Sequence, residues 1–428
     1  MNPAVWSFWV AVSQGVHAAM ELERTLGDYT NVEVTIVHWE NNFLFHPLLP
    51  AVVGGSVLPS NVVHPIRRMC PRTEFVRGHV SAIDALSNEV TLDLPSGQMG
   101  MLQYDQLIVA LDAEPDYTMV PGLLEHALPF KSIGDALHVR RRIIDNLEQA
   151  TTTADPDLRN SLLTVCVLGG GIKGCAIAAE LRTLFRSALA SYSSLEDNEL
   201  RIVLIDNEGE LLAGYPSNMA AAVEKRLLEL GVELRLGYVA ATVEPDAVVM
   251  ASGVEVPAGM VVNTLSTFSP VLKGLTDRDS QIVANSYLQL KSANNIFVAG
   301  DDPREAVFWA RREIDMGRHA ALNASAALRG EALRKWSEPH HVFDLLPLGR
   351  TASVFWIFGI VANGFVAGSL FKLQCLLAMP TLERNLRLIL DWIIGSMFHQ
   401  NIAVLTAGRS LNRNELHVEA SKEIIRAG

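Results

Sequence analysis

The sequence predicts an α/β protein in which two Rossmann-type units precede a helical C-terminal segment. Two stretches carry this prediction, WVAVSQGVHAAMELERTL from residue 9 and LGGGIKGCAIAAELRTL from residue 168. Each sets an apolar strand before a turn and an Ala-rich helix, and the two helices end in a similar pattern. Further β-rich runs and helical periods alternate with them, which favours parallel strands joined by right-handed crossovers.

Length and composition narrow the class of protein. With 428 residues the chain is long enough for two or three domains. Its net charge of −12, without a basic cluster, argues against a nucleic-acid partner, because phosphate neutralisation needs clustered Lys and Arg. We expect no metal site, no disulfide framework and a reducing compartment, because the cysteines lack C-x-x-C spacing. They are Cys70, Cys166, Cys175 and Cys375.

The first unit keeps the outline of a nucleotide-binding turn with altered residues. Only Gly15 remains of three expected glycines, and Val10 and Val12 occupy the positions of the first two. A β-branched side chain there intrudes where backbone must approach a pyrophosphate. The next strand, in the run from 31 to 50, ends at His38, where a carboxylate is expected to accept from ribose hydroxyls. An imidazole cannot replace that acceptor.

The second unit has the intact fingerprint. A helical period to about residue 150 and a polar linker lead into the strand LTVCVL. Gly169, Gly171 and Gly174 follow in G-x-G-x-x-G spacing and open a helix, whose N-terminus would face the phosphates. Asp206 ends the next strand, in position to hold the ribose hydroxyls. The alternative is a glycine turn kept only for packing. A helix that ends at the C-cap Gly231, followed by strands, completes the unit.

A second turn could also reach a ligand. The β-run NNIFVAGDD, residues 294–302, ends in Gly300 and Asp301 before a helix. This would place the Asp301 carboxylate near a bound ligand. Gly-Asp turns are common in proteins, so an ordinary turn is the alternative.

The C-terminal segment has two interpretations. Residues 354–371 carry no charge over 18 residues, the lower limit for a membrane-spanning helix. The next helical period, 382–399, places polar and apolar residues on opposite faces. The polar face holds Arg384, Arg387 and Asp391, and the apolar face Leu382, Leu386, Ile389, Ile393 and Met397. The pair either covers the protein as buried helices or forms a monotopic membrane patch, with Trp392 at the interface.

The chain's first residues are also apolar, from Val5 to Val12. We expect no signal peptide, because no Lys or Arg precedes Arg24 and the run is too short to span a bilayer.

Together these segments resemble the type II NADH:quinone oxidoreductases over nearly the whole chain. The resemblance rests on an ordered series: FLFHPLLPAVVGGSVLPSNVVHPIRRM, FVRGHVSAID, YDQLIVAL, VPGLLEHALPFKSIGDALHVRRRI, LLTVCVLGGGIKGC, IFVAGDD and LERNLRLILDWIIGSMFHQNIAVL. The last of these resembles the family's membrane-attachment tail. Disulfide reductases and sulfide:quinone oxidoreductases of the same fold need a reactive cysteine pair, and the sequence shows no convincing one.

The resemblance implies a glutathione-reductase-like arrangement of domains. Residues 1–150 and 265–335 would form the FAD-type domain, 160–264 the NAD-binding domain and 336–428 a membrane-associated segment. Hydride would pass from NADH to FAD, and electrons would go on to a quinone entering from the membrane side. The protein would sit on the membrane surface through its C-terminal amphipathic helices, facing the reducing compartment, and a homodimer is compatible with this.

The resemblance also assigns residues by matching position, although it gives no catalytic residue. NAD(H) would be held by Gly169, Gly171, Gly174 and Asp206, and NADH is favoured because a carboxylate repels a 2′-phosphate. The flavin nucleotide would lie near Gly15, Pro47, Leu48, Gly300 and Asp301, with Asp301 on the ribityl chain. Lys131 also matches a family pattern, with no role assigned.

Several positions depart from the family. Besides Val10, Val12 and His38, the chain has Asp112 after YDQLIVAL where the family has Gly, and Ala176 where it usually has Glu. The helix after Asp301 lacks the glutamines that line the family's quinone site. A mistaken start of the chain would explain only the two valines. The alternative function is therefore a relative that has lost FAD and acts as an NAD(H)-sensing, structural or regulatory protein.

Overall fold

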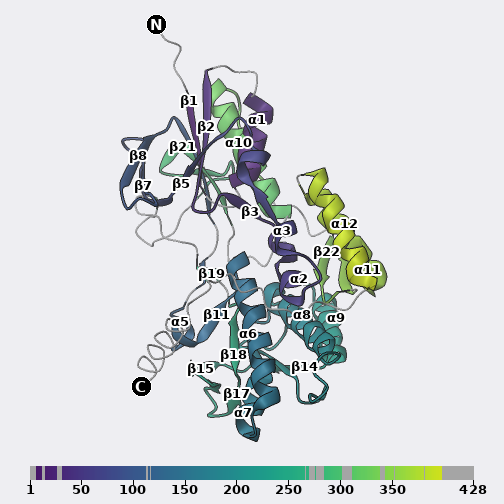
Figure 1. Ribbon diagram of the computed structural model, residues 1–428. Helices are drawn as coiled ribbons and strands as arrows, with labels where there is room; N and C mark the ends of the chain where they lie inside the picture. The colour runs from purple at the N-terminus through teal and green to yellow at the C-terminus, as the bar shows by residue number, and fades with distance from the viewer. Residues whose placement is uncertain are drawn as a thin grey trace, which may run out of the picture.

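The computed structural model describes most of the chain as helices, strands and connecting loops. The described residues are 6–11, 15–26, 31–111, 114–115, 117–265, 267–268, 275, 284–300, 311–337, 343–350, 352–379 and 381–397. They form a mixed α/β molecule with two separate main sheets, one mostly and one wholly parallel, and a C-terminal layer of strands and helices (Figure 1). The predicted fold class is confirmed.

The first sheet has six strands in the order β20-β21-β9-β1-β2-β5. All neighbours are parallel except β20 and β21. Helices α1 and α10 lie side by side against it (Figure 1), and α1 packs through buried Val16, Ala19 and Leu22. The elements are β1 (Trp6–Ala11), α1 (Gly15–Leu26), β2 (Val32–His38), β5 (Glu74–Arg77), β9 (Gln106–Leu111), β20 (Gln289–Leu290), β21 (Ala293–Gly300) and α10 (Arg311–Arg329).

Small elements extend the first unit. A three-stranded antiparallel sheet follows β5, and a short hairpin with helices follows β2. The sheet holds β6 (His79–Asp84), β7 (Glu89–Asp93) and β8 (Met99–Gln103). The other segment holds β3 (Asn42–Leu44), the 3-10 helix η1 (His46–Leu48), α2 (Leu49–Gly54), α3 (Pro59–Val62), β4 (Val63–Pro65) and α4 (Ile66–Met69).

The second sheet is wholly parallel, with five strands in the order β11-β18-β12-β13-β14. All five residues of β12 are buried, as expected for a central strand covered on both faces. Its elements are α5 (Leu123–His126), β11 (Ala127–Pro129), α6 (Ile133–Thr152), α7 (Pro156–Leu162), β12 (Thr164–Leu168), α8 (Ile172–Ala188), β13 (Arg201–Asp206), α9 (Ser217–Leu230), β14 (Val232–Leu236) and β18 (Met260–Asn263).

Local sequence signals set several boundaries in this unit. Ser132 and Asp135 form a capping box that starts α6. Gly231 ends α9 in the left-handed conformation, at φ 84°, as predicted. The polar stretch interpreted as a linker contains the short helix α7, which Asp155 caps by accepting from the N–H groups of Asp157 and Leu158. That helix was missed.

The remaining strands flank the two sheets. Antiparallel β15, β16 and β17 form a small sheet next to the second unit, and β10 pairs with β19. Their bounds are β10 (Glu114–Pro115), β15 (Ala240–Val243), β16 (Ala247–Met250), β17 (Glu255–Pro257) and β19 (Thr267–Phe268).

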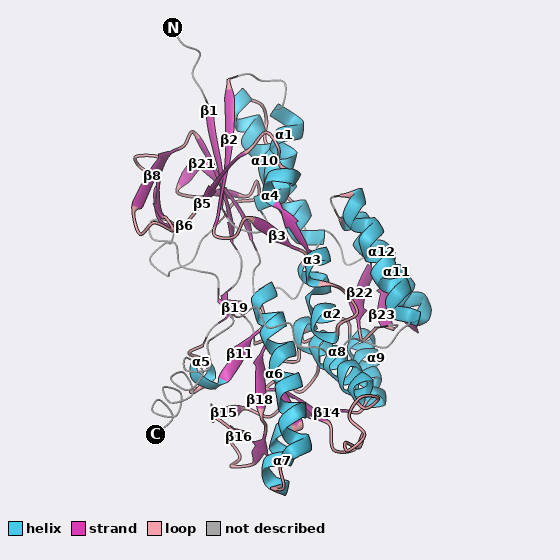
Figure 2. Cartoon of the chain, viewed as in Figure 1, coloured by secondary structure: helices cyan, strands magenta, loops and turns pink. Residues whose placement is uncertain are grey.

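The C-terminal layer consists of an antiparallel sheet and two helices on one flank of the molecule (Figure 2). Residues 354–371 are not one long helix, because the strands Ser353–Ile357 and Ile360–Gly364 pair as an antiparallel hairpin. Phe358 and Gly359 form its turn, and Gly364 ends it, all three at positive φ. Only the last part of the run is helical, which corrects the helical interpretation of the run. The elements are β22 (Phe343–Pro347), β23 (Ser353–Ile357), β24 (Ile360–Gly364), α11 (Phe365–Ala378) and α12 (Leu382–Met397).

This layer is attached to both units. Asn218 of α9 accepts from the Trp356 indole N–H at 3.0 Å and donates to the Gly359 carbonyl at 2.7 Å. On the other side, one Asp391 carboxylate oxygen of α12 accepts from the Asn61 amide at 2.6 Å and from the Leu58 N–H at 3.0 Å. Asp391 thus bonds α12 to the first unit.

Candidate functional site

The glycine loop of the second unit has the geometry that its sequence predicts. Gly169 follows β12 at φ 108°, a backbone conformation that L side chains rarely adopt. A methyl group at position 174 would overlap the carbonyl oxygen of Gly169, so the third glycine permits the close approach of helix and turn. The three glycines therefore shape one tight strand-to-helix turn.

The start of α8 is open to a ligand. Gly171 is the N-cap residue, no side chain caps the helix, and a Cβ atom at this position would have no neighbour within 4 Å. The N–H groups of the first turn are the usual partners of a dinucleotide pyrophosphate. The cradle left by the missing side chains fits such a group.

Asp206 lies beside this loop. It is the last residue of β13. One carboxylate oxygen accepts from the Gly170 N–H and the other from the Glu208 N–H at 2.7 Å. The structure thus brings together Gly169, Gly171, Gly174 and Asp206 at the carboxyl ends of parallel strands, where open α/β sheets bind ligands.

The first unit presents the matching edge of its own sheet. Gly15 is buried and starts α1. Gly300 ends β21 opposite Leu111 of β9, and β9 adjoins β1. Val10 lies in β1 between β2 and β9. Val12, Asp112 and Asp301 lie outside the described residues.

The end of β2 differs from a ribose-binding site. The Nδ1 atom of His38 lies 2.9 Å from the Glu40 N–H, in a local turn. Next to it, the Trp39 ring stacks on His79 at 4.3 Å between ring centres, and Arg77 lies over the same ring at 5.2 Å. The first unit keeps Gly15 at the start of α1 and the carboxyl edge of a parallel sheet, and it offers an imidazole in place of the ribose carboxylate.

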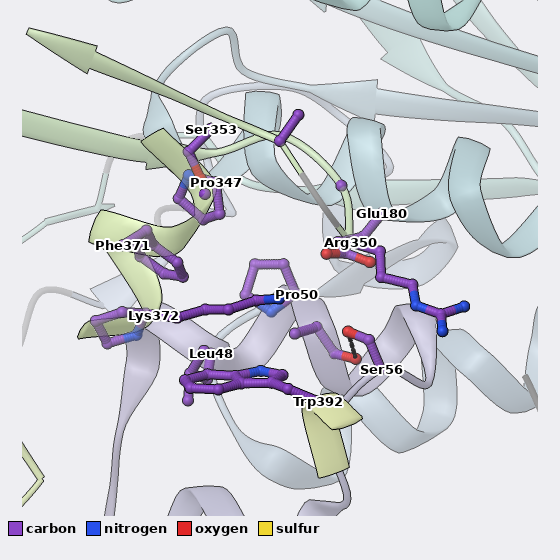
Figure 3. Close-up of a pocket in the computed structure, with 15 residues that line it drawn as sticks. Leu48, Pro50, Ser56, Glu180, Pro347, Arg350, Ser353, Phe371, Lys372 and Trp392 are labelled. Carbon is purple, nitrogen blue, oxygen red and sulfur yellow. Dashed lines mark hydrogen bonds between the residues drawn. The ribbon is translucent and has the colours of Figure 1, made fainter. Parts of the chain in front are cut away.

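Pro47 and Leu48 lie on the wall of a small cavity where three parts of the molecule meet (Figure 3). Segment 46–56 of the first unit, helix α8 of the second unit and the C-terminal layer all contribute side chains. The cavity volume is about 30 Å³, room for one or two water molecules. Its lining includes Pro47, Leu48, Pro50, Ser56, Glu180, Arg350, Ser353, Phe371, Lys372 and Trp392.

Glu180 is a functional candidate that the sequence reasoning missed. Its side chain is buried, its Oε2 atom has no hydrogen-bond partner, and it packs so close to Gly54 of α2 that a Cβ there would overlap it. Burial raises the pKa of this carboxyl to about 8, although Arg350 opposes the shift. An acid inside the apolar run of α8 was the available signal.

Lys372 enters the same cavity from α11. Its Nζ atom lies 5.5 Å from the centre of the Trp392 ring, which is a cation–π contact. Burial and the nearby Arg350 lower the pKa of Lys372. Figure 3 shows the Lys372 side chain above the Trp392 ring and beside Pro50.

The C-terminal helices expose apolar side chains. Asp391 bonds inward and Arg384 donates to the Ser60 carbonyl at 2.5 Å, so these two residues of the polar face point toward the protein. Arg387, the third, pairs with Glu383 at the surface at 2.8 Å. The buried helical pair is therefore wrong as an interpretation of the described residues. We call the exposed apolar residues of these two helices the apolar face. They are Phe365, Val366, Leu370, Leu373, Leu377, Leu382, Leu386, Leu390, Ile393, Ile394 and Met397.

Two buried histidines give a pH-dependent stability. Burial is the main cause that lowers the pKa of both His17 and His64 to about 4. His64 places Nε2 3.0 Å from the Met379 sulfur. In the unfolded chain each imidazole binds a proton with the ordinary pKa of 6.5, whereas in the folded chain it does so only near pH 4. The free energy of unfolding therefore falls as the pH drops from 6.5 towards 4.

For His64 this loss is expected to reach about 3 kcal/mol. Urea unfolding across this pH range should show a smaller fall for His64→Gln than for the wild type. His138→Gln, a change at an exposed position of α6, should keep the wild-type slope. Equal slopes in all three proteins would contradict the assignment.

The fold, with glycine where a strand leads into a helix at the carboxyl edge of each main sheet, defines the class of protein. The chain belongs to the pyridine nucleotide-disulphide oxidoreductase family, whose sequence model matches residues 14–314. All four cysteines are free and buried. Within the described residues there is no group of three or more His, Cys, Asp or Glu side chains that could hold a metal ion.

Particular relatives narrow the resemblance. A type II NADH:quinone oxidoreductase of Mycobacterium tuberculosis is 26% identical over 401 residues, 89% of this chain and 85% of the relative. External alternative NAD(P)H-ubiquinone oxidoreductase B2 of Arabidopsis thaliana mitochondria is 28% identical over 289 residues, 63% of this chain. The chain spans 50% of that plant relative's length.

Solved structures share the fold. The NDH2 of Plasmodium falciparum in complex with NADH superposes with a TM-score of 0.79 at 15% identity, covering 93% of this chain and 100% of that one. A sulfide:quinone oxidoreductase of Aquifex aeolicus gives a TM-score of 0.67 at 16% identity, covering 94% and 100%. The resemblance to type II NADH:quinone oxidoreductases is confirmed.

Proposed function

We propose that the protein is an NADH:quinone oxidoreductase that works at a membrane surface. The observation that carries the proposal is the complete nucleotide turn of the second unit, with Asp206 beside it, in a chain of this family. The names of the relatives, which are NADH or NAD(P)H:quinone oxidoreductases, support the same reaction.

The cofactors of this proposal are FAD and NAD(H). When bound, the flavin supplies the hydride and electron chemistry. The backbone N–H groups in the first turn of α8, which follows Gly171, would bind the NADH pyrophosphate. Asp206 would release the Gly170 N–H and accept hydrogen bonds from the ribose hydroxyls instead. The same carboxylate would repel a 2′-phosphate, so we expect NADH to be preferred over NADPH.

The flavin nucleotide would lie along the carboxyl edge of the first sheet. Gly15 and Gly300 are the described residues of the expected site at this edge, and Asp301 follows directly. Pro47 and Leu48 would lie near the flavin ring, and they line one cavity together with residues of the C-terminal layer.

The apolar face supports attachment to a lipid surface. No described helix is long and apolar enough to cross a membrane. Helices α11 and α12 instead turn apolar side chains outward while Arg384 and Asp391 bond to the protein. Helices of this kind lie in the membrane interface without spanning it. The face toward the reducing compartment and the homodimer stay predictions.

The visible absorption spectrum of the purified protein tests the proposal first. We expect flavin bands, retained or restored by incubation with FAD, and NADH-dependent reduction of a soluble quinone. A protein that shows no flavin bands even after incubation with FAD would overturn the oxidoreductase and leave the NAD(H)-binding alternative. NADH binding by isothermal titration separates that result from a misfolded preparation.

A further inference from the structure

Glu180 lines the cavity where the first unit, the second unit and the C-terminal layer meet. Its residue is 3% exposed, and Oε2 is a buried oxygen without a hydrogen-bond partner. Figure 3 shows the carboxyl group at the cavity, opposite the side chains of Lys372 and Trp392. A buried polar atom without a partner destabilises the fold by about 1–3 kcal/mol, so its presence here calls for a role.

The other charged groups around Glu180 are cations. Arg350 acts on it electrostatically from the C-terminal layer, and Lys372 lines the same cavity from α11. On the α2 side Arg140 donates to the Val53 carbonyl at 2.7 Å, next to the Gly54 that Glu180 touches. Among the residues that line the cavity Glu180 is the only acid.

The cavity lies between the expected flavin site, which would donate the electrons, and the helices of the apolar face, from which the quinone would enter. Pro47 and Leu48, which the resemblance assigns to the flavin site, line the cavity from the first unit, and Phe371, Lys372 and Trp392 line it from the helices that carry the apolar face. An acceptor that enters from a membrane through this layer would therefore be reduced next to the cavity. Apolar walls would exclude bulk water from that place.

We propose that Glu180 is a proton store for the acceptor, which it supplies through water in the cavity. This rests on the proposed function. The overall reaction is NADH + H⁺ + quinone → NAD⁺ + quinol, so each turnover takes up one proton beyond the hydride. The O–H bond of the Glu180 carboxyl breaks, an O–H bond forms on the acceptor oxygen that gains the electrons, and the carboxylate regains a proton from solvent.

The protonation state of the carboxyl agrees with this role. A pKa near 8 keeps Glu180 neutral and able to donate at neutral pH. As the pH rises through this value Glu180 is deprotonated, and it can no longer donate a proton to the acceptor. Quinone reduction should therefore decline on the alkaline side with a midpoint near 8.

The test compares quinone with ferricyanide, an acceptor that takes one electron and no proton. In Glu180→Gln we expect the ratio of quinone to ferricyanide rates, both with NADH, to fall roughly 10²-fold, the lower end for general-acid contributions. The alkaline decline should disappear. Glu224→Gln, the same chemical change on α9, should keep the wild-type ratio and profile.

A second variant separates a proton store from a structural role. Arg350 lowers the pKa of Glu180, so Arg350→Gln should move the alkaline midpoint to higher pH. Infrared difference spectra over the same pH range report the carboxyl directly. The C=O band of the neutral acid should vanish with that midpoint and be missing in Glu180→Gln.

Several outcomes would overturn the proposal. An unchanged rate ratio in Glu180→Gln, or a carboxyl band that does not titrate, leaves no role for a stored proton. Equal loss with both acceptors also leaves this ratio unchanged and overturns the proposal, because the loss is then a defect in folding or cofactor binding. If the wild type reduces ferricyanide and no quinone, the proposed function fails, and the infrared band still reports on Glu180.

Discussion

Replacing Gly174 by alanine is expected to weaken NADH binding roughly 5- to 150-fold. The new methyl group would overlap the Gly169 carbonyl oxygen, a backbone atom that cannot rotate away. Overpacking of this kind costs about 1–3 kcal/mol, and each 1.4 kcal/mol is roughly a tenfold change in affinity. The turn and the first turn of α8 would separate, which displaces the N–H groups that face the pyrophosphate. Isothermal titration with NADH measures the effect.

Two further alanine variants make this result specific. At Gly171 a methyl group meets no atom of the protein, so Gly171→Ala should keep the free energy of unfolding and still weaken NADH binding, because it enters the space of the phosphates. At Gly134, near the start of α6, the nearest atom to a new Cβ is Ser132 Oγ at 3.5 Å. Gly134→Ala should bind NADH normally. Normal binding by Gly174→Ala would refute the nucleotide site.

Charging the apolar face is expected to release the protein from lipid vesicles. Leu386 and Leu390 lie one helical turn apart on α12 and are 56% and 54% exposed. Burial of each leucine in the interface contributes about 1.5–3 kcal/mol, so Leu386→Asp with Leu390→Asp should lower the vesicle partition coefficient by roughly 10²–10⁴. Co-sedimentation with phospholipid vesicles provides the measurement.

The chain contains a matched control for this experiment. Leu228 on α9 is 53% exposed, belongs to the second unit and is not a residue of the apolar face. Leu228→Asp should leave vesicle binding unchanged, although it adds one of the two negative charges that the double variant adds. Equal release by both sets of variants would indicate a general charge effect, and no release by either would show that α12 does not anchor the protein.

The local parts of the fold were predictable from the sequence. The turn of Gly169–Gly174, the strand that ends in Asp206 and the C-cap Gly231 depend on neighbours within a few residues or on the next strand. Their residue types report backbone conformation directly. The same holds for His38, where the structure places an imidazole at the end of β2 as the sequence indicates.

The rest depended on contacts between distant segments. The cavity joins Leu48, Glu180, Arg350 and Trp392, which no periodicity connects. In the same way, residues 354–371 satisfy a helical hydropathy pattern, yet three positive φ values divide them into a hairpin and a helix. Asp391 was predicted on a polar face with Arg384 and Arg387. That grouping did not indicate that the polar side would bond to segment 58–61 and turn the leucines outward.

Helix α2 has a consequence for the modularity of the molecule. It belongs by sequence to the first unit, yet it packs against α6 and α8 of the second, and Gly54 leaves room for Glu180. A chimera that exchanges one nucleotide unit with a relative must therefore carry residues 49–54 together with the unit they contact. Exchanging either unit alone would disrupt the contacts of α2 with α6 and α8. We therefore expect substitutions in α2 to be accompanied by substitutions in the helices that it contacts.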